Sequence, residues 1–372
     1  MKIWANSGDS HYFEPEDLYS SGLPAALAER MPRSVKSEDG TSETIYVDGK
    51  SFTRPMPKIQ TVKGKGGQTL VEALRAPGAY DMKIRRADLD QEGIWAELIY
   101  PSVGLWNSMI TDPVLAREAV KVANDWAVDI QQNNVRHVMP AQISPLDVDD
   151  AVAEVQRVAG MGIKAINLPC TTPEGTPDFN RPYWEPLWAA MEETGMVMAV
   201  HTGAGGEEAV FFHGPGAGTV NYLWASYSGM TMAAFMVASG VLDRHPGLKL
   251  VISEAGATWV PFVGDRLNEA YRQHSDFIRD SLTRLPKEIL FDQVYASFQH
   301  DESAVEALTA MGYNNVMWGS DYPHIEGTFG HTQKTLHELF DDQPESVRHR
   351  ITQGAFLELF PHVGQSPLEG KE

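Results

Sequence analysis

The chain has 372 residues, of which 42% are hydrophobic and 22% are charged, a composition typical of a folded globular protein. Its 50 acidic and 30 basic residues give a net charge of −20 at pH 7, so binding to nucleic acid or to an anionic membrane surface is not expected. The single cysteine, Cys170, excludes an internal disulfide and a four-thiolate metal site.

The amino-terminal residues do not combine a basic segment with an apolar one, and no apolar run reaches the roughly 18 residues needed to span a bilayer. We therefore expect a cytoplasmic protein that does not enter a membrane. No linker, low-complexity tract or internal repeat divides the sequence, so residues 1–372 are expected to form one domain.

Short β-branched or apolar segments alternate with amphipathic segments along the chain, which is the pattern of a parallel α/β fold. The predicted strands are Lys2–Ala5, Ala96–Tyr100, Arg136–Ile143, Ala165–Leu168, Met196–Val200, Leu248–Ile252, Gln293–Ala296 and Asn315–Trp318. The predicted helices are Asp112–Asn133, Asp147–Met161, Arg181–Gly195, Ser228–His245, Ala257–Ile278 and Glu302–Met311. Eight strands with intervening helices indicate a (β/α)₈ TIM barrel.

Residues 17–90 form an insertion between the first and second predicted strands. It contains TSETIYVDGKSFTRP, in which Asp48-Gly49 is typical of a tight hairpin turn, and KGKGGQ at residues 63–68, which is typical of a loop. We expect this insertion to act as a lid over the mouth of the barrel or to contact another subunit.

Ionisable side chains gather at the predicted carboxyl ends of four strands, the face that carries the active site in barrels of this type. The first strand runs into DSHYFEP, the fifth ends in AVHTGAG, the sixth ends in VISEAG, and the eighth leads into WGSDYPHIEGT. The candidate ligands are Asp9, His11, Glu14, His201, Glu254, Asp321 and His324. Imidazoles and carboxylates without thiolates fit zinc, manganese or iron.

Each of these residues, taken singly, also has a structural explanation. His201 can be a buried core histidine, Glu254 can cap the helix that follows it, and Asp321 can form a turn. His213 and His300 lie on the same predicted face and are further candidates for proton transfer or an extra ligand. The coincidence of metal-competent side chains at four strand ends favours a metal site over these separate explanations.

The chain resembles the amidohydrolase superfamily, and within it the branch that contains aminocarboxymuconate-semialdehyde and γ-resorcylate decarboxylases. The resemblance is carried by DSHYFEPEDLY, YPSVGLW, ANDW, PYWEPLWAAMEETGMVMAVHTGAG, RHPGLKLVISEAGATWVPF and MWGSDYPH, and it extends over most of the chain. It implies a (β/α)₈ barrel with metal at the carboxyl-terminal face.

The chain departs from those decarboxylases at three motifs. They carry a His-x-His or Glu-x-His motif after strand one, whereas this chain has Asp9-Ser10-His11. Their catalytic histidine lies in a Gly-His-x-Gly-Glu stretch, whereas the corresponding stretch here is Ser253-Glu254-Ala255-Gly256. His324 stands where they usually have phenylalanine. The family's acid/base residue is therefore missing, and additional metal-competent groups are present.

The number of candidate ligands separates one metal ion from two. A mononuclear site with an open position needs three or four protein ligands. The predicted ligands, with Asp9 in reserve, are His11, Glu14, His201, Glu254, Asp321 and His324. Unmetallated carboxylates crowded in one site would repel each other and be poorly solvated. We therefore expect two divalent ions, with iron preferred over manganese or zinc, and catalytic roles for Glu254, Asp321 and His324.

This ligand set resembles a branch of amidohydrolase-related oxygenases, so we predict a non-haem di-iron or manganese–iron oxygenase that hydroxylates a small organic substrate with dioxygen. The rival hypothesis is a hydrolase in which two metals activate a hydroxide for attack on an amide, ester or lactone. A mononuclear decarboxylase is the third. A non-catalytic barrel subunit is disfavoured because the ligand set is complete. The fold family also leads us to expect a homo-oligomer or a pair with a related barrel subunit.

Overall fold

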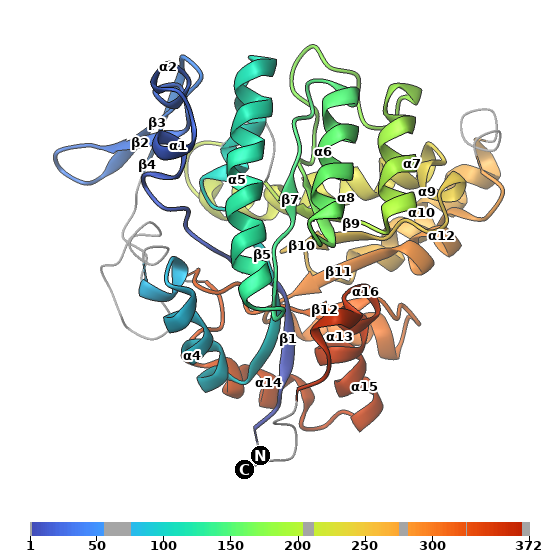
Figure 1. Ribbon diagram of the computed structural model, residues 1–372. Coiled ribbons are helices and arrows are strands. Elements are labelled where there is room, and N and C mark those ends of the chain that lie inside the picture. Colours follow the sequence, from blue (N-terminus) through green and yellow to red (C-terminus); the bar gives the residue numbers. More distant parts are fainter. Residues whose placement is uncertain (1, 56–75, 204–211, 275–281, 325, 367–372) are drawn as a thin grey trace.

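The computed structural model of the protein describes residues 2–55, 76–203, 212–274, 282–324 and 326–366. Its centre is a ring of parallel strands (Figure 1). In chain order these are β1 (Ala5–His11), β5 (Ile94–Tyr100), β6 (His137–Val138), β7 (Ala141–Gln142), β8 (Ala165–Leu168), β9 (Val197–His201), β10 (Leu250–Ser253), β11 (Val294–Phe298) and β12 (Val316–Trp318). With β6 and β7 counted as one interrupted strand, the described residues form the predicted eight-stranded TIM barrel.

Two irregular seams complete this ring. At the first, β6 pairs with β5 and β7 pairs with β8, and Met139-Pro140 separates them, because proline has no amide N–H to donate. At the second, β1 meets the segment after β12, where the amide of Asp321 donates to the carbonyl of Asp9 at 2.8 Å and the amide of His11 donates to that of Tyr322 at 2.6 Å. The second seam therefore joins two segments that carry candidate ligands.

The first strand lies elsewhere than predicted. It covers Ala5–His11, not Lys2–Ala5, and all seven of its residues are buried. The prediction relied on apolar residues, but this strand is polar, and its polar side chains form hydrogen bonds inside the barrel. The Ser7 hydroxyl lies 2.6 Å from the carbonyl oxygen of Asp9 and 3.0 Å from the hydroxyl of Ser320. Asp9 and His11 are consequently part of the strand, not of a loop after it.

Helices surround the barrel (Figure 1). They are α4 (Met82–Glu92), α5 (Pro113–Asn133), α6 (Val148–Gly160), α7 (Glu185–Thr194), α8 (Ala217–Ala238), α9 (Val241–Arg244), α10 (Trp259–Gln273), α12 (Pro286–Gln293), α13 (Glu302–Thr309), α14 (Thr332–Phe340), α15 (Glu345–His349) and α16 (Ala355–Leu359). The helix predicted from Ser228 is wrong at both ends, because α8 begins eleven residues earlier and α9 is separate. The end of the helix predicted over residues 257–278 lies partly outside the described residues.

The insertion contains α1 (Leu18–Gly22), α2 (Ala25–Ala28) and an antiparallel sheet of β2 (Arg33–Lys36), β3 (Ser42–Val47) and β4 (Lys50–Pro55), which stands beside α5 in Figure 1. The hairpin turn is confirmed: Asp48 and Gly49 have φ angles of 48° and 77°. The Asp48 carboxylate accepts from Arg30 Nε at 3.0 Å and from the amide of Thr111 at 2.9 Å, which fastens the sheet to the barrel. The segment KGKGGQ lies outside the described residues.

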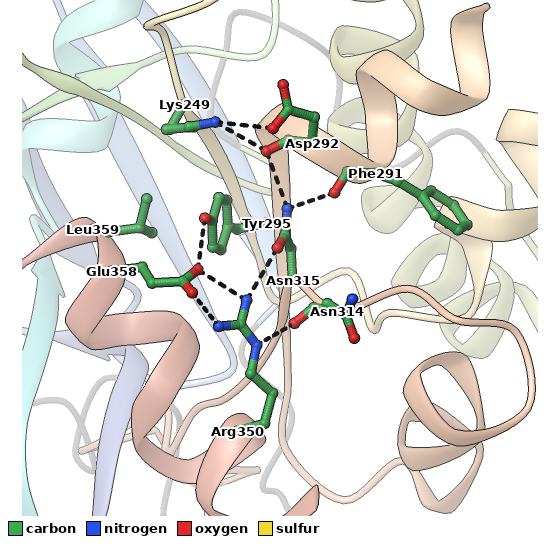
Figure 2. Close-up of a pocket in the computed structure, with 9 residues that line it drawn as sticks. All are labelled: Lys249, Phe291, Asp292, Tyr295, Asn314, Asn315, Arg350, Glu358 and Leu359. Atoms are coloured by element: carbon green, nitrogen blue, oxygen red, sulfur yellow. Dashed lines mark hydrogen bonds and ion pairs between the residues drawn. The ribbon is translucent and has the colours of Figure 1, made fainter. Parts of the chain in front are cut away.

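A polar cavity of about 640 Å³ lies at the amino-terminal ends of β10, β11 and β12 (Figure 2). Arg350 donates to both oxygens of Glu358, at 2.5 and 2.9 Å, and to the carbonyl of Asn314 at 2.7 Å. This guanidinium lowers the pKa of Glu358. The amino-terminal face of such a barrel contributes to stability, and here it anchors the carboxyl-terminal helices.

Among the described helices, none is both long and apolar enough to cross a membrane. The lid or contact role of the insertion, the single-domain organisation, the cytoplasmic location and the association with another subunit stay predictions.

Candidate metal centre

The carboxyl-terminal ends of the barrel strands bring most of the predicted ligands together. Asp9 and His11 are two residues apart on β1, so both project from the same side of the strand. His201 is the last residue of β9, and Glu254 directly follows β10. Asp321 lies three residues beyond β12. These side chains therefore converge because parallel strands end at one face of the barrel.

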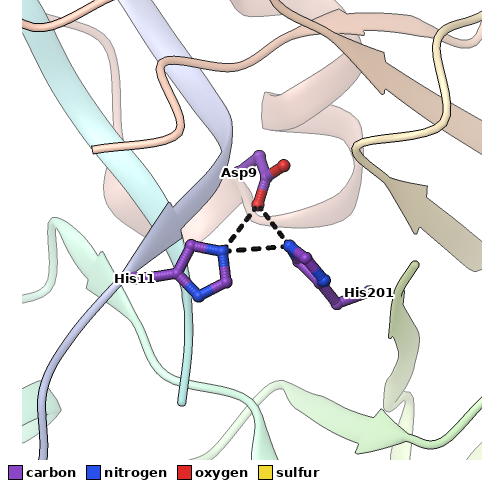
Figure 3. A group of neighbouring side chains, drawn as sticks. All are labelled: Asp9, His11 and His201. Carbon is purple, nitrogen blue, oxygen red and sulfur yellow. Dashed lines mark hydrogen bonds and ion pairs between the residues drawn. The ribbon is translucent and has the colours of Figure 1, made fainter. Parts of the chain in front are cut away.

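Asp9, His11 and His201 form the innermost group (Figure 3). The Nε2 atoms of the two histidines are 2.9 Å apart, and Asp9 Oδ1 lies 3.8 Å from His11 Nε2 and 3.7 Å from His201 Nε2. His201 Nδ1 lies 2.7 Å from the carbonyl oxygen of Thr202. Because a carbonyl oxygen can only accept, Nδ1 carries the proton and the Nε2 lone pair of His201 faces the group.

Asp321 connects this group to His324 and to two further carboxylates. Its Oδ1 lies 3.5 Å from His11 Nε2 and 2.8 Å from His324 Nδ1, and the rings of His11 and His324 stack with centroids 4.0 Å apart. Glu254, Asp321 and Glu326 form a further group with metal-ligand spacing. Glu254 Oε2 also lies 3.2 Å from His201 Nε2, so the groups share one continuous cluster.

Burial and like charges disfavour the ionised forms of Asp9, Glu254 and His201. Burial raises the pKa of Asp9 well above its usual value, and the charges of Asp321 and Glu254 add to the effect. Burial also raises the pKa of Glu254 and, together with His324, lowers that of His201 to about 3. Among the described residues, nothing donates a hydrogen bond to either carboxylate oxygen of Asp9. Neutral imidazoles beside unsatisfied buried carboxyl groups fit a divalent cation, which would offset this cost.

The backbone is strained at two of these carboxylates. Glu254 and Asp321 have φ angles of 63° and 53°, in the left-handed region that favours glycine. The only other non-glycine residue with a positive φ in the described chain is Asp48, which the hairpin turn explains. Strain of this kind is concentrated at functional sites, where the surrounding structure enforces it.

Glu14 does not join the cluster. Its Oε1 accepts from the amide of Gly104 at 2.6 Å and its Oε2 from the amide of Val103 at 2.9 Å. It lines a cavity of about 310 Å³ between the loop after β1 and the small sheet, and it belongs to none of the metal-competent groups of the described residues. We therefore leave Glu14 out of the ligand set, because it lies in none of the groups with metal-ligand spacing and its oxygens accept from backbone amides instead.

Two carboxylates that the predicted ligand set did not include lie in the cluster. Asp9, held in reserve, lies in the innermost group, and Glu326 joins Glu254 and Asp321. Glu326 belongs to the same WGSDYPHIEGT segment as Asp321 and His324, so its position five residues after Asp321 was the available signal.

A buried ion pair holds the backbone next to the candidate ligands. Arg85 of α4 is fully buried and donates from Nε and Nη2 to the two carboxylate oxygens of Glu97, both at 2.6 Å. Its Nη1 donates to the carbonyl of His11 at 2.7 Å, and its guanidinium lies 4.7 Å from the ring centre of Tyr322. Burial alone would raise the pKa of Glu97, but Arg85 and His137 hold it at about 2. Arg85 thus fixes the backbone beside two candidate ligands.

Comparison with known proteins places this chain among amidohydrolases. Residues 98–361, more than half of the chain, match the amidohydrolase family model. The chain is 25% identical over 190 residues to 6-methylsalicylic acid decarboxylase of Penicillium expansum, covering 48% of this chain and 54% of that protein. It therefore spans about half the length of the curated relative it matches.

Three solved structures share the fold over nearly their whole length. An amidohydrolase from Mycobacterium avium subsp. paratuberculosis K-10 is 20% identical, with a TM-score of 0.77 and 99% of each chain covered. The 5-carboxyvanillate decarboxylase of Sphingomonas paucimobilis is 18% identical, with a TM-score of 0.70 and 97% and 99% covered. A dihydroxybenzoic acid decarboxylase of Polaromonas sp. JS666, with bound manganese, is 14% identical, with a TM-score of 0.68 and 98% of each covered. These likenesses confirm the TIM barrel.

The left-handed backbone at residue 254 predicts an unusual order of stability. Glu254→Gly and Glu254→Ala remove the same carboxylate, but only glycine adopts φ 63° without strain, so we expect the glycine variant to be more stable by about 1 kcal/mol. Urea unfolding of the metal-free variants measures this difference. The matched control is exposed Glu306 in α13, where the alanine variant should be the more stable one. Equal stability, or a more stable Glu254→Ala, would contradict the assignment of strain.

The buried pair of Arg85 and Glu97 predicts a rescue. Arg85→Met should lower the free energy of unfolding by about 3–5 kcal/mol, because it leaves the buried Glu97 carboxylate without its guanidinium partner. Adding Glu97→Gln removes that charge, so we expect the double variant to regain part of the loss. Denaturant titration of both variants and of Glu97→Gln alone tests this. Strictly additive losses would show that the two side chains are not coupled.

Proposed function

The chain belongs to the amidohydrolase family, and on this premise we propose that it is a divalent-metal-dependent enzyme that decarboxylates a small hydroxylated aromatic acid. The observation that carries the proposal is the convergence of two imidazoles and two carboxylates at the carboxyl-terminal face of the barrel. The proposed ligands of one ion are Asp9, His11, His201 and Asp321. Decarboxylation is favoured over oxygenation because the curated relative and two of the solved structures that share this fold are decarboxylases.

The spacing of these four ligands suits a single ion. Nitrogen and oxygen atoms bound at about 2.0–2.2 Å from one metal lie roughly 3 to 3.5 Å apart. The distances from His11 Nε2 to His201 Nε2, Asp321 Oδ1 and Asp9 Oδ1 are 2.9, 3.5 and 3.8 Å. Asp9, His11 and His201 already have metal-ligand spacing, and a movement of the Asp321 side chain toward them would add the fourth donor. This donor set suits manganese, zinc or iron.

A bound divalent ion supplies Lewis acidity, which draws electron density from a coordinated carboxylate or phenolate oxygen. The proton must come from the protein. Glu254 lies beside His201, in the stretch where the decarboxylases that the chain resembles carry their catalytic histidine. In its acid form Glu254 protonates the ring carbon that bears the carboxylate. The carbon–carbon bond then breaks, its electrons return to the ring, carbon dioxide leaves, and Glu254 regains a proton from solvent.

This proposal predicts one metal ion per chain and release of carbon dioxide without oxygen uptake. The test uses protein loaded with Mn²⁺ and a panel of hydroxybenzoic acids that includes 6-methylsalicylic acid. We expect Asp9→Asn and His201→Ala to lose the ion and to lower activity by more than the roughly 10–100-fold that loss of an outer-shell partner costs. His337→Ala, which removes an exposed histidine of α14, is the control and should change neither quantity. Oxygen consumption coupled to a hydroxylated product would refute decarboxylation.

A two-metal oxygenase is the second candidate, and one observation favours it. Glu254, Asp321 and Glu326 have metal-ligand spacing, and His324 contacts Asp321. Glu254, Asp321 and Glu326 would hold a second ion there, and Glu326 would take the place that the predicted ligand set gave to Glu14. In that case the substrate would be a small organic molecule hydroxylated with dioxygen.

Metal stoichiometry separates the two candidates. We expect His324→Ala and Glu326→Gln to leave the metal content at one ion per chain, because neither residue belongs to the four proposed ligands. Elemental analysis of protein reconstituted with Fe²⁺ or Mn²⁺, in parallel with Asp9→Asn, measures this. A fall from two ions to one in both variants, accompanied by loss of oxygen uptake, would favour the dinuclear oxygenase.

A further inference from the structure

Helix α8 is apolar on two opposite sides. One side is buried against the barrel and consists of Gly229, Met232, Ala233, Met236 and Val237. Half a turn away, large apolar side chains recur every three or four residues and stay 41–54% exposed: Val220, Leu223, Trp224, Tyr227 and Phe235. At about 1.5 Å per residue, this outer stripe is roughly 22 Å long. A helix that is apolar on two opposite sides has two contact faces, and the barrel covers only one of them.

The outer stripe is also free of charge. No Asp, Glu, Lys or Arg occurs over the 22 positions of α8, although 22% of the chain is charged and its net charge is −20. The ring of Trp224 lies 5.3 Å from that of Tyr227 and 5.9 Å from that of Phe212, so aromatic surfaces adjoin at its amino-terminal end. A solvent-facing helix normally carries polar and charged residues on its outer side, so this stripe indicates an interaction surface.

The charge pattern selects the partner. Helices that lie on a membrane surface carry lysine and arginine to meet anionic headgroups, and α8 has neither. A partner of opposite charge would be recognised through acidic side chains, which α8 also lacks. A two-fold symmetric contact between two copies has the opposite requirement, since a charge near the axis would face its own copy and be repelled. An uncharged stripe therefore suits a second copy of this chain.

The exposed area is large enough for such a contact. If a large apolar side chain has about 150–250 Å² of surface, the exposed parts of the five side chains amount to roughly 450 Å² in each copy. Two stripes in contact would cover about 900 Å² of apolar surface. Because homodimer interfaces are about 65% apolar, this corresponds to about 1,400 Å² in total, within the range of about 1,200–2,000 Å² for specific, stable interfaces.

We propose that two copies of this chain form a two-fold symmetric dimer through the outer stripes of α8. The proposal does not depend on the metal centre or on the proposed function. The inner side of the same helix is packed closely against β10: a Cβ at Gly229 would lie 2.6 Å from a methyl group of Ile252. The dimer therefore holds α8 between the barrel and the partner copy.

Light scattering coupled to size-exclusion chromatography tests the proposal. We expect the wild-type protein to have twice the 41.1 kDa mass of the chain at micromolar concentration. Leu223→Arg and Tyr227→Arg place a charge in the interface of both copies, so each should raise the dimer Kd at least tenfold. The matched control is Ile84→Arg, which makes the same charge change at a side chain 40% exposed in α4. Helix α4 precedes β5, across the strand ring from β9, so this variant should stay dimeric.

Salt provides a second measurement, on the unchanged protein. Raising NaCl from about 50 mM to about 500 mM screens the repulsion between two acidic chains and leaves apolar contacts in place, so the dimer Kd should fall. A monomeric wild-type protein would show that something other than a second copy covers the stripe, and would overturn the proposal. A dimer that both α8 variants leave intact, or a Kd that rises with salt, would overturn it as well. Thermal unfolding verifies that each variant is folded.

Discussion

Two backbone hydrogen bonds, from Asp321 to the carbonyl of Asp9 and from His11 to the carbonyl of Tyr322, close the barrel between β1 and the segment after β12. The residues that make these bonds include three of the proposed metal ligands. The hydrogen bonds that close the barrel therefore also position these candidate ligands. The geometry of the ligands is set by paired backbone segments, not by flexible loops. Arg85 strengthens the same seam, since it binds the His11 carbonyl and lies against the Tyr322 ring.

The centre is costly for the metal-free protein. Buried carboxyl groups with raised pKa values face each other, and Glu254 and Asp321 hold left-handed backbone angles that a side chain disfavours. The rest of the barrel carries this cost through its extensive apolar core and its polar anchor at Arg350. Unfavourable backbone angles and buried carboxyl groups are concentrated at the candidate metal centre, as expected for a site selected for function and not for stability.

The sequence predicted the barrel and the positions of His201, Glu254, Asp321 and His324 because those residues end or follow apolar strands that alternate with amphipathic helices. It failed for β1, whose polar residues satisfy one another inside the barrel and so lack the apolar pattern of a strand. It also failed for the start of α8, where an apolar helix with an exposed half gives no amphipathic period.

Glu14 illustrates a different limit. From the sequence it is a carboxylate three residues after His11 and therefore a reasonable ligand. In the fold, the loop after β5 turns the amides of Val103 and Gly104 toward it, and both oxygens are occupied. Such a partnership depends on long-range placement of backbone donors, which residue spacing along the chain does not encode.

Charge balance ties the number of metal ions to the chemistry that the centre can perform. Four carboxyl groups, those of Asp9, Glu254, Asp321 and Glu326, converge on neutral imidazoles. Two divalent ions would balance four ionised carboxylates, and no carboxylic acid would remain to deliver a proton. One ion balances two, and burial raises the pKa of Glu254, which favours its neutral acid form. A single-ion centre thus contains its own proton donor for decarboxylation, whereas a two-ion centre exchanges that donor for a second metal and with it the capacity to use dioxygen.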